Sequence, residues 1–389
     1  MKKIVDLVSK SAYTDGYSYH ENVLPKYHGR LKGYEVSVLV SPYSMDPNNN
    51  NSHYLNYREP YVDSRGIRII PLKPSFPGSL PERFGFFSDV LKRLEEENPD
   101  IIFMHFCQSF ALIDVVRYLK KHPNCRLYCD NHADYTNSGR GFFSKKIVHN
   151  VLYRGLLSLC DSFVERYWGV LPARVDFLVE NYGIERAKCD VLVMGGDDDL
   201  VKKAKDESNK DIVLKRASLG EVKKLIVFGG KIDSDKTQVL ELIKAVGNLK
   251  DEGVGLLLFG SVSPDLKDLF DSLVGGYANV SYIGWVRSEA SYELFEVADL
   301  VCFPGRHSVF WEQAAAQGKP LLLKQWPSYE HIDRFGNVAY TEGDTAEEIE
   351  KSIRMVFSNG RMEQMKCAAE SSARYFLYSA IAKRSLMLD

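Results

Sequence analysis

Two lysines in the second half of the chain have the spacing to hold a diphosphate. An apolar run ends at Phe228 and continues as Gly229-Gly230, with Lys231 next and Lys236 five residues later. Paired glycines let the backbone approach a ligand closely, and the start of the following helix offers unpaired N–H groups that suit an anion. The segment is not a Walker A loop, because no Gly-Lys-Ser/Thr follows four spacer residues. A solvated turn with two surface lysines is the alternative interpretation.

A carboxylate follows a later apolar run. The stretch from Phe303 to Pro320 predicts a strand end, a turn and a helix that Ser308 caps and Gly318 closes. A capping box needs its acid three residues after the cap, whereas Glu312 comes four residues after Ser308, so capping does not explain it. A carboxylate one turn into a helix could accept both hydroxyls of a ribose. The alternative is an exposed helical glutamate.

Strands must position both groups, since both follow apolar runs. Such runs alternate with amphipathic stretches from end to end, and continuous apolar runs predict parallel strands buried on both faces. The pattern starts again after residue 221, which predicts an α/β protein of two doubly wound units. The predicted strands are Ile4–Val8, Glu35–Val40, Ile67–Pro71, Ile101–Met104, Arg126–Asp130, Lys223–Phe228, Gly255–Phe259, Val280–Ile283, Leu300–Phe303 and Pro320–Leu323. The predicted helices are Phe87–Glu97, Ala111–Lys121, Gln238–Leu249, Pro264–Leu273, Glu289–Val297, Val309–Gln317 and Thr345–Phe357.

The domain prediction follows from this restart. Residues 1–195 form a first Rossmann-like domain and residues 196–365 a second, with a hinge at Gly195–Asp199. Residues 366–389 are expected to form a helix that packs back on the first domain. Ligands of such domains bind at the carboxyl ends of the strands.

Bulk composition excludes some classes of partner and compartment. A formal charge of −2 shows no basic excess that would indicate nucleic acid. No stretch approaches the ~18 apolar residues of a membrane span, and Asp6 interrupts the first apolar run, so a cytoplasmic protein is expected. The seven scattered cysteines are expected to be buried free thiols.

The motifs of the second half resemble glycosyltransferase family 4, which comprises retaining GT-B enzymes that use nucleotide sugars. In that family two basic residues hold the donor diphosphate, and they match Lys231 and Lys236. A later glutamate binds the ribose, and it matches Glu312. The resemblance implies a GT-B fold of two Rossmann-like domains facing a cleft, a donor that is most often a UDP-sugar, and no cofactor or metal. The donor-binding residues that it implies are Gly16, Gly230, Gly260, Trp285, Val286, His307, Ser308, Val309 and Glu312.

The first half resembles a branch of this family that works on bacterial capsular and surface polysaccharides. Asp15-Gly16 matches the glycine loop that faces the donor phosphates, and Tyr19–Tyr27 and Cys129–Tyr135 match that branch. His132 matches the acceptor-domain histidine that approaches the donor sugar. The resemblance implies His132, Lys231 and Lys236 as catalytic residues and His20, Asn22 and Asp134 as acceptor-side residues. A buried histidine satisfied by the core is the alternative for His132.

One departure concerns recognition of the sugar. The family carries two glutamates with seven residues between them, but the position of the first is Pro304 here. His307 and Ser308 are candidates to replace it as hydrogen-bond donors, and a purely structural turn is the alternative.

The resemblance implies retaining transfer of a hexose-type sugar to a glycan or a polyprenol-linked acceptor. Arg140–Arg154 is basic and apolar without an acid, so it predicts a helix that rests on an anionic membrane surface, with a core-facing helix as the alternative. Two rival functions are a nucleotide-sugar epimerase of the same architecture and a non-catalytic sugar-nucleotide-binding protein.

Overall fold

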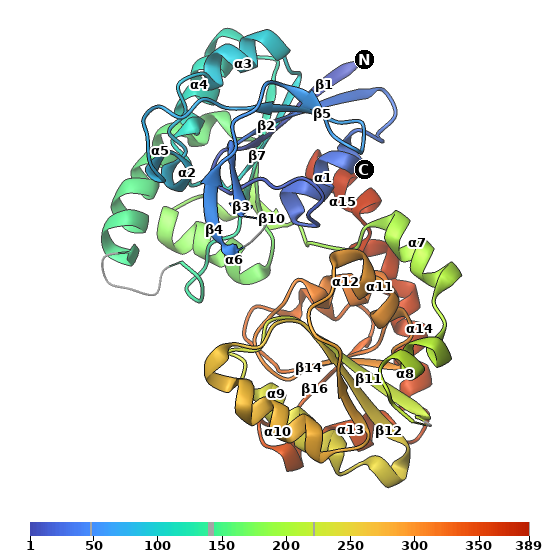
Figure 1. Ribbon diagram of the computed structural model, residues 1–389. Coiled ribbons are helices and arrows are strands. Elements are labelled where there is room, and N and C mark those ends of the chain that lie inside the picture. The colour runs from blue at the N-terminus through green and yellow to red at the C-terminus, as the bar shows by residue number, and fades with distance from the viewer. Residues whose placement is uncertain (47–48, 139–143, 221, 389) are drawn as a thin grey trace. The chain divides into compact units, whose positions relative to one another are not determined.

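The computed structural model describes residues 1–46, 49–138, 144–220 and 222–388, without the side chains of 46, 49–52 and 144–146 (Figure 1). Contacts divide the chain into two compact units. Unit 1 comprises Met1–Val193 with Ile381–Asp389, and unit 2 comprises Met194–Ala380. Each unit has its own sheet and its own core.

Unit 1 is built on an eight-stranded sheet in the order β10-β9-β8-β7-β1-β2-β6-β5, and every neighbouring pair is parallel except β5 with β6. Its strands are β1 (Lys2–Val8), β2 (Tyr34–Val40), β5 (Tyr61–Val62), β6 (Arg68–Pro71), β7 (Ile101–His105), β8 (Arg126–Asn131), β9 (Arg166–Gly169) and β10 (Cys189–Val191), and a separate hairpin joins β3 (Tyr43–Asp46) to β4 (Asn49–Leu55). The order reverses direction between β1 and β7. The crevice at the carboxyl ends of these two strands is therefore where this topology binds ligands.

Helices lie on both sides of this sheet (Figure 1). They are α1 (His20–His28), α2 (Leu80–Phe84), α3 (Val90–Glu97), α4 (Ala111–Lys121), α5 (Arg154–Cys160), α6 (Pro172–Phe177) and, from Ile381 onward, α15 (Tyr378–Ser385). A π-helix, Ser144–Tyr153, leads into α5. β7 is buried over its whole length, as its continuous apolar run predicted.

Three polar residues interrupt these buried strands on one face of the sheet. Asp6 pairs with Phe103, which lies two residues before His105, so both polar side chains point to the same face. The pairing of Met104 with Cys129 then places His105 beside Asp130. All three of these polar residues are fully buried.

Unit 2 is built on a six-stranded parallel sheet in the order β13-β12-β11-β14-β15-β16. Its strands are β11 (Lys224–Gly229), β12 (Val254–Phe259), β13 (Val280–Tyr282), β14 (Leu300–Phe303), β15 (Leu321–Leu323) and β16 (Val338–Tyr340). In chain order this is 3-2-1-4-5-6, the order of a Rossmann fold, and the direction reverses between β11 and β14.

The helices of unit 2 cover both faces of its sheet (Figure 1). They are α7 (Asp198–Glu207), α8 (Lys210–Arg216), α9 (Gln238–Gly247), α10 (Lys267–Gly276), α11 (Ser288–Glu296), α12 (Phe310–Ala316), α13 (Ala346–Val356) and α14 (Arg361–Ala373). The acidic residues of the predicted hinge begin α7, because Asp197 caps it by accepting the N–H of Asp199.

The C-terminal prediction needs correction. Residues 366–389 are not one helix on the first domain, because the chain turns at Arg374–Phe376 and Leu377 pairs with Gly196 inside unit 2. Only Ile381–Asp389 belong to unit 1, and unit 1 otherwise ends at Val193 rather than at residue 195. In the same way, the sequence alone did not distinguish β5, β9, β10 or β16, which are short.

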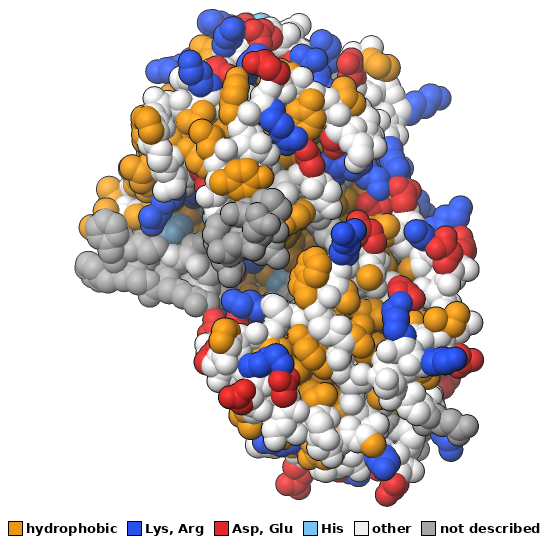
Figure 2. All heavy atoms as spheres, in the orientation of Figure 1, with side chains coloured by type: hydrophobic (Ala, Val, Ile, Leu, Met, Phe, Trp, Pro, Cys, Tyr) orange, Lys and Arg blue, Asp and Glu red, His pale blue; other side chains and the backbone are white. Residues whose placement is uncertain are grey.

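Basic and acidic side chains are interspersed on the face shown in Figure 2, in keeping with the near-neutral net charge. Within the described residues, no helix combines the length and the apolar character that crossing a bilayer requires. All seven cysteines are free, as predicted, but the expectation of burial is wrong for Cys367, which is exposed on α14.

Candidate functional site

The reversal of strand order in unit 2 brings together the two loops that the sequence singled out. The pairing of Val227 with Val301 aligns β11 with β14, so both loops leave the same edge of the sheet. A Cβ atom added to Gly230 would lie 3.9 Å from Ser308 Oγ. One added to Gly305 would lie 3.9 Å from Lys236 Cα. Arg306 Nη1 also lies 2.9 Å from the Asp235 carboxylate, so the two candidate donor-binding segments are in contact.

The glycines of this edge are required by close backbone packing. Gly230 has φ +131° and Gly260, at the end of β12, has φ +126°, a region that other residues rarely adopt. A Cβ atom on Gly260 would lie 1.9 Å from the carbonyl oxygen of Gly230. Both glycines therefore allow the backbone segments that follow β11 and β12 to pack closely at the carboxyl edge of the sheet.

The two lysines differ in environment. Lys231 is exposed and lies 3.4 Å from the Asp233 carboxylate, whereas Lys236 is partly buried directly before α9. Burial lowers the pKa of Lys236, and the nearby cations of Lys231 and Arg306 lower it further, against the opposing effect of Asp233. Lys231, Lys236 and Arg306 lie close together, and Arg306 pairs with Asp235 at 2.9 Å, so a bound diphosphate would compete with the nearby carboxylates for these cations.

Glu312 lies in the first turn of α12 but does not cap it, as the sequence predicted. The helix begins one residue later than predicted, with Val309 at the N-cap, and Ser308 Oγ accepts only a long 3.4 Å bond from the Phe310 N–H. The Glu312 Oε1 atom lies 2.8 Å from both His307 Nε2 and His331 Nε2.

This carboxylate is wholly buried. Burial raises the pKa of Glu312, but His307 and His331 outweigh that effect and lower it to about 2. Its Oε2 atom makes no hydrogen bond to the described part of the chain. The interpretation of Glu312 as an exposed helical glutamate is therefore wrong, and Oε2 is a buried oxygen without a partner among the described residues.

Three other predicted donor residues lie at the surface of unit 2. Trp285 and Val309 are exposed. Val286 lines a hollow of about 700 Å³ at the edge strand β13, together with Ser281 and Arg287. Neither Lys236 nor Glu312 lines this hollow.

In unit 1, the loop between β1 and α1 carries Gly16. Gly16 is exposed, has φ +80°, and no atom lies within 4 Å of where its Cβ would be. Asp15 beside it accepts from Arg58 Nη2 at 3.0 Å and from Tyr61 OH at 2.9 Å. Asn22 is buried, and its Nδ2 donates to the Thr14 carbonyl at 3.1 Å. Asn22 therefore holds this loop through its side chain.

His132 follows β8 at the carboxyl edge of the sheet, with 18% of its side chain exposed and its Nε2 3.3 Å from Asp130 Oδ1. His20, at the start of α1, is buried, and its ring centroid lies 5.7 Å from that of His132. These two predicted residues are thus brought together. Asp134 is instead used locally, since its Oδ1 accepts from the Thr136 N–H at 2.7 Å and its Oδ2 pairs with Arg174 at 3.3 Å.

The sequence reasoning missed the groups that hold these histidines and Glu312. In unit 1, Asp130 lies beside His20 and His132, and His105 pairs with Asp130. In unit 2, His331 supplies the second bond to Glu312. The signal for His105 and Asp130 was a polar residue at the carboxyl end of a predicted strand. His331 lies in an isolated 3₁₀ turn, where the sequence carried no comparable signal.

Comparisons with known proteins bear on the fold. No protein-family model matches the sequence, and no curated protein does. A glycosyltransferase from Rickettsia africae is similar in structure, with a TM-score of 0.67 at 13% identity over 100% of this chain and 97% of that one. Anabaena HepE in complex with UDP and glucose matches with a TM-score of 0.64 at 13% identity over 100% and 99% of the two chains. A putative UDP-N-acetylglucosamine 2-epimerase from Listeria monocytogenes matches with a TM-score of 0.64 at 14% identity over 99% and 95%. The predicted fold class is confirmed: the chain has two Rossmann-like units of the GT-B fold.

Proposed function

We propose that the protein is a glycosyltransferase that takes its sugar from a nucleotide-sugar donor bound at the carboxyl edge of β11 and β14. The observation that carries the proposal is the contact between the Lys231–Lys236 loop and the Gly305–Glu312 segment. Clustered cations next to the start of α9 suit a diphosphate, and the buried Oε2 of Glu312 suits a ribose hydroxyl. As the diphosphate leaves, the same cations stabilise its developing charge.

The finer assignment extends this proposal. We expect a UDP-sugar donor of the hexose type, transfer with retention, no metal requirement, and a glycan or lipid-linked acceptor in surface polysaccharide synthesis. Structural neighbours solved with UDP and glucose, or named as UDP-sugar epimerases, support the choice of UDP. Activity that persists in EDTA, and anomeric configuration read by NMR of the product, test the metal and stereochemical parts.

The first experiment is a thermal-shift panel of UDP, GDP, ADP and their sugars, with wild type beside Glu312→Ala. Ligand binding stabilises the native state, so one nucleotide should raise the melting temperature and the variant should lose that rise. Glu289→Ala, an exposed acid on α11, is the matched control that should keep it. No shift at millimolar concentration for any nucleotide would contradict the donor site.

An epimerase is the second candidate, because epimerases of this fold are similar over the whole chain. Incubation of the donor alone separates the two functions. An epimerase releases an altered sugar nucleotide without an acceptor, whereas a transferase releases the nucleoside diphosphate and extends a glycan.

The membrane is proposed as a further partner through the helical stretch before and within α5. Arg140 and the side chains of Lys145 and Lys146 lie outside the described residues, but the exposed apolar side chains there are Ile147, Val151, Leu152 and Leu159. The opposite side of the stretch faces the core, as the alternative expected, because Tyr153, Leu156 and Leu157 are buried there. Co-sedimentation with phosphatidylglycerol vesicles should be lost in Val151→Asp/Leu159→Asp and kept in Ile212→Asp, a control at an exposed site in unit 2.

A further inference from the structure

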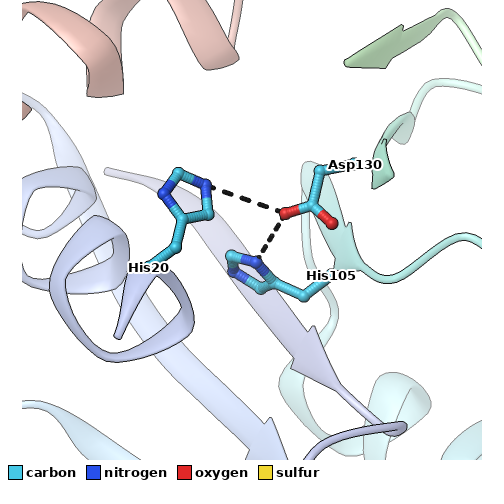
Figure 3. A group of neighbouring side chains, drawn as sticks. All are labelled: His20, His105 and Asp130. Atoms are coloured by element: carbon cyan, nitrogen blue, oxygen red, sulfur yellow. Dashed lines mark hydrogen bonds and ion pairs between the residues drawn. The ribbon is translucent and has the colours of Figure 1, made fainter. Parts of the chain in front are cut away.

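Asp130 is the centre of a buried polar cluster in unit 1. Its Oδ1 accepts from the Phe106 N–H at 2.7 Å and lies 3.3 Å from His132 Nε2. Its Oδ2 lies 2.8 Å from His105 Nδ1 and 3.7 Å from His20 Nε2 (Figure 3). One carboxylate at the end of β8 thus faces three imidazoles from three different elements.

His105 keeps that carboxylate in place. Its Nδ1 bonds to Asp130, and its Nε2 lies 3.5 Å from Asp6 Oδ1. An imidazole with a carboxylate at each nitrogen is best satisfied as the doubly protonated cation. Burial lowers the pKa of His105, but Asp130 and Asp6 outweigh it and raise the pKa to about 10.

The cluster continues away from the carboxyl edge of the sheet. Asp6 also lies 3.0 Å from His28 Nδ1, and His28 Nε2 lies 2.7 Å from Ser385 Oγ in α15. His28 and Asp6 are fully buried, so every member behind Asp130 is sealed from solvent. His132, with 18% of its side chain exposed, is the member of the cluster that solvent reaches.

His132 is also oriented by a ring. Phe106 lies 4.5 Å from it between centroids, at an interplanar angle of 35°. Phe106 has φ +63°, a strained value for a bulky residue, and its N–H is the one that Asp130 accepts. The carboxylate therefore fixes both the imidazole and the backbone of the ring that packs against it.

We propose that Asp130 is a positioning residue that holds His132 with its proton on Nε2, so that Nδ1 accepts a hydrogen bond from a neutral sugar hydroxyl rather than binding a phosphate or carboxylate. His132 Nε2 makes no hydrogen bond to the described residues, but it lies 3.3 Å from the ionised Asp130 carboxylate, which repels a lone pair and favours a proton on that nitrogen. His20 adds no positive charge, because burial holds its pKa well below the ordinary value. That the hydroxyl belongs to a sugar rests on the function proposed above. The tautomer of His132 does not depend on that function.

A bound metal ion is the competing interpretation of the cluster. Ligand atoms of His20, His105 and Asp130 lie within 4.8 Å of one another. A metal on these atoms would need the lone pair of His105 Nδ1, which carries a proton in the arrangement described here.

Ring-nitrogen NMR of protein labelled with ¹⁵N-histidine tests the proposal directly. At pH 8 we expect His132 as the Nε2–H tautomer and His105 protonated on both nitrogens, with His132→Gln and His105→Gln used for assignment. In Asp130→Asn, His105 should lose its second proton and His132 its single tautomer. His132 protonated on Nδ1 in wild type, or an unchanged tautomer in a folded Asp130→Asn, would overturn the proposal, as would a stoichiometric metal ion in the purified protein.

A ligand titration and kinetics complete the test. With UDP saturating the donor site, 10 mM inorganic phosphate should leave the His132 ring signals unmoved, and a shift of them would refute the exclusion of anions. Asp130→Asn should lower donor turnover roughly 10- to 100-fold while leaving donor KM within about 3-fold. A protein that binds no nucleotide but shows the expected tautomers would refute the proposed function alone.

Discussion

His331 Nε2 lies 2.8 Å from Glu312 Oε1, although the two residues come from a 3₁₀ turn and a helix on opposite sides of β15 in the sequence. His307 reaches the same oxygen at the same distance. Both bonds fall on one oxygen of a wholly buried carboxylate. The other oxygen, Oε2, has no hydrogen-bond partner among the described residues. This geometry makes the ionised form of Glu312 part of the stability of the fold.

Glu312→Gln should change the acid stability of the protein. The folded pKa of Glu312 is about 2, below its ordinary value of 4.5, so ionisation stabilises the fold above pH 4.5 and that contribution is lost as pH falls toward 2. The difference in unfolding free energy between wild type and variant should therefore shrink by roughly 3 kcal/mol from pH 5 to pH 2. Denaturant titrations at pH 2.5, 3.5, 5 and 7 measure it, and a difference independent of pH would contradict the pairing.

Lys236→Met should weaken nucleotide binding more than Lys231→Met. Lys236 is partly buried among cations, whereas Lys231 is exposed, so the charge of Lys236 acts at lower dielectric on a diphosphate. Calorimetry should show the Kd for UDP raised roughly 10- to 100-fold in Lys236→Met and about 3-fold in Lys231→Met. Uridine, which lacks the phosphates, should bind both variants and wild type alike. Equal effects of the two variants would place the diphosphate elsewhere.

Gly260→Ala and Gly16→Ala form a matched pair, since both glycines have positive φ. At Gly260 the new Cβ meets the Gly230 carbonyl oxygen at 1.9 Å, whereas at Gly16 it meets open space. We expect Gly260→Ala to lower the unfolding free energy by about 2–4 kcal/mol and Gly16→Ala by about 1 kcal/mol. Urea denaturation checks this, and similar losses for the two would mean that only φ matters.

His105→Gln should alter stability at alkaline pH. The pKa of His105 is raised from 6.5 to about 10, so its charge stabilises the fold fully below pH 6.5 and that stabilisation is lost as pH rises through 10. The stability advantage of wild type should decline by roughly 3–5 kcal/mol between pH 6.5 and 10. Denaturant unfolding at pH 6, 8 and 10 measures the decline.

Much of the fold could be predicted from the chain itself, for identifiable reasons. Ala111–Lys121 is a helix with the predicted bounds, because its apolar residues recur at helical spacing. Leu300–Phe303 is likewise a strand as predicted, because its continuous apolar run can only be buried on both faces. The segment Met365–Leu388 was less predictable, since the break at Leu377 depends on pairing with Gly196, far away in the sequence.

The sequence by itself determined the two α/β units and placed Lys231, Lys236 and Glu312 after strand ends, since apolar periodicity and glycines act locally. Only the tertiary structure decided which groups face them. Strand order sets the Gly305 loop against Lys236, and strand register sets His105 against Asp130. Those contacts join residues from separate strands, and a buried carboxylate acquires its partners only once the sheet has formed around it.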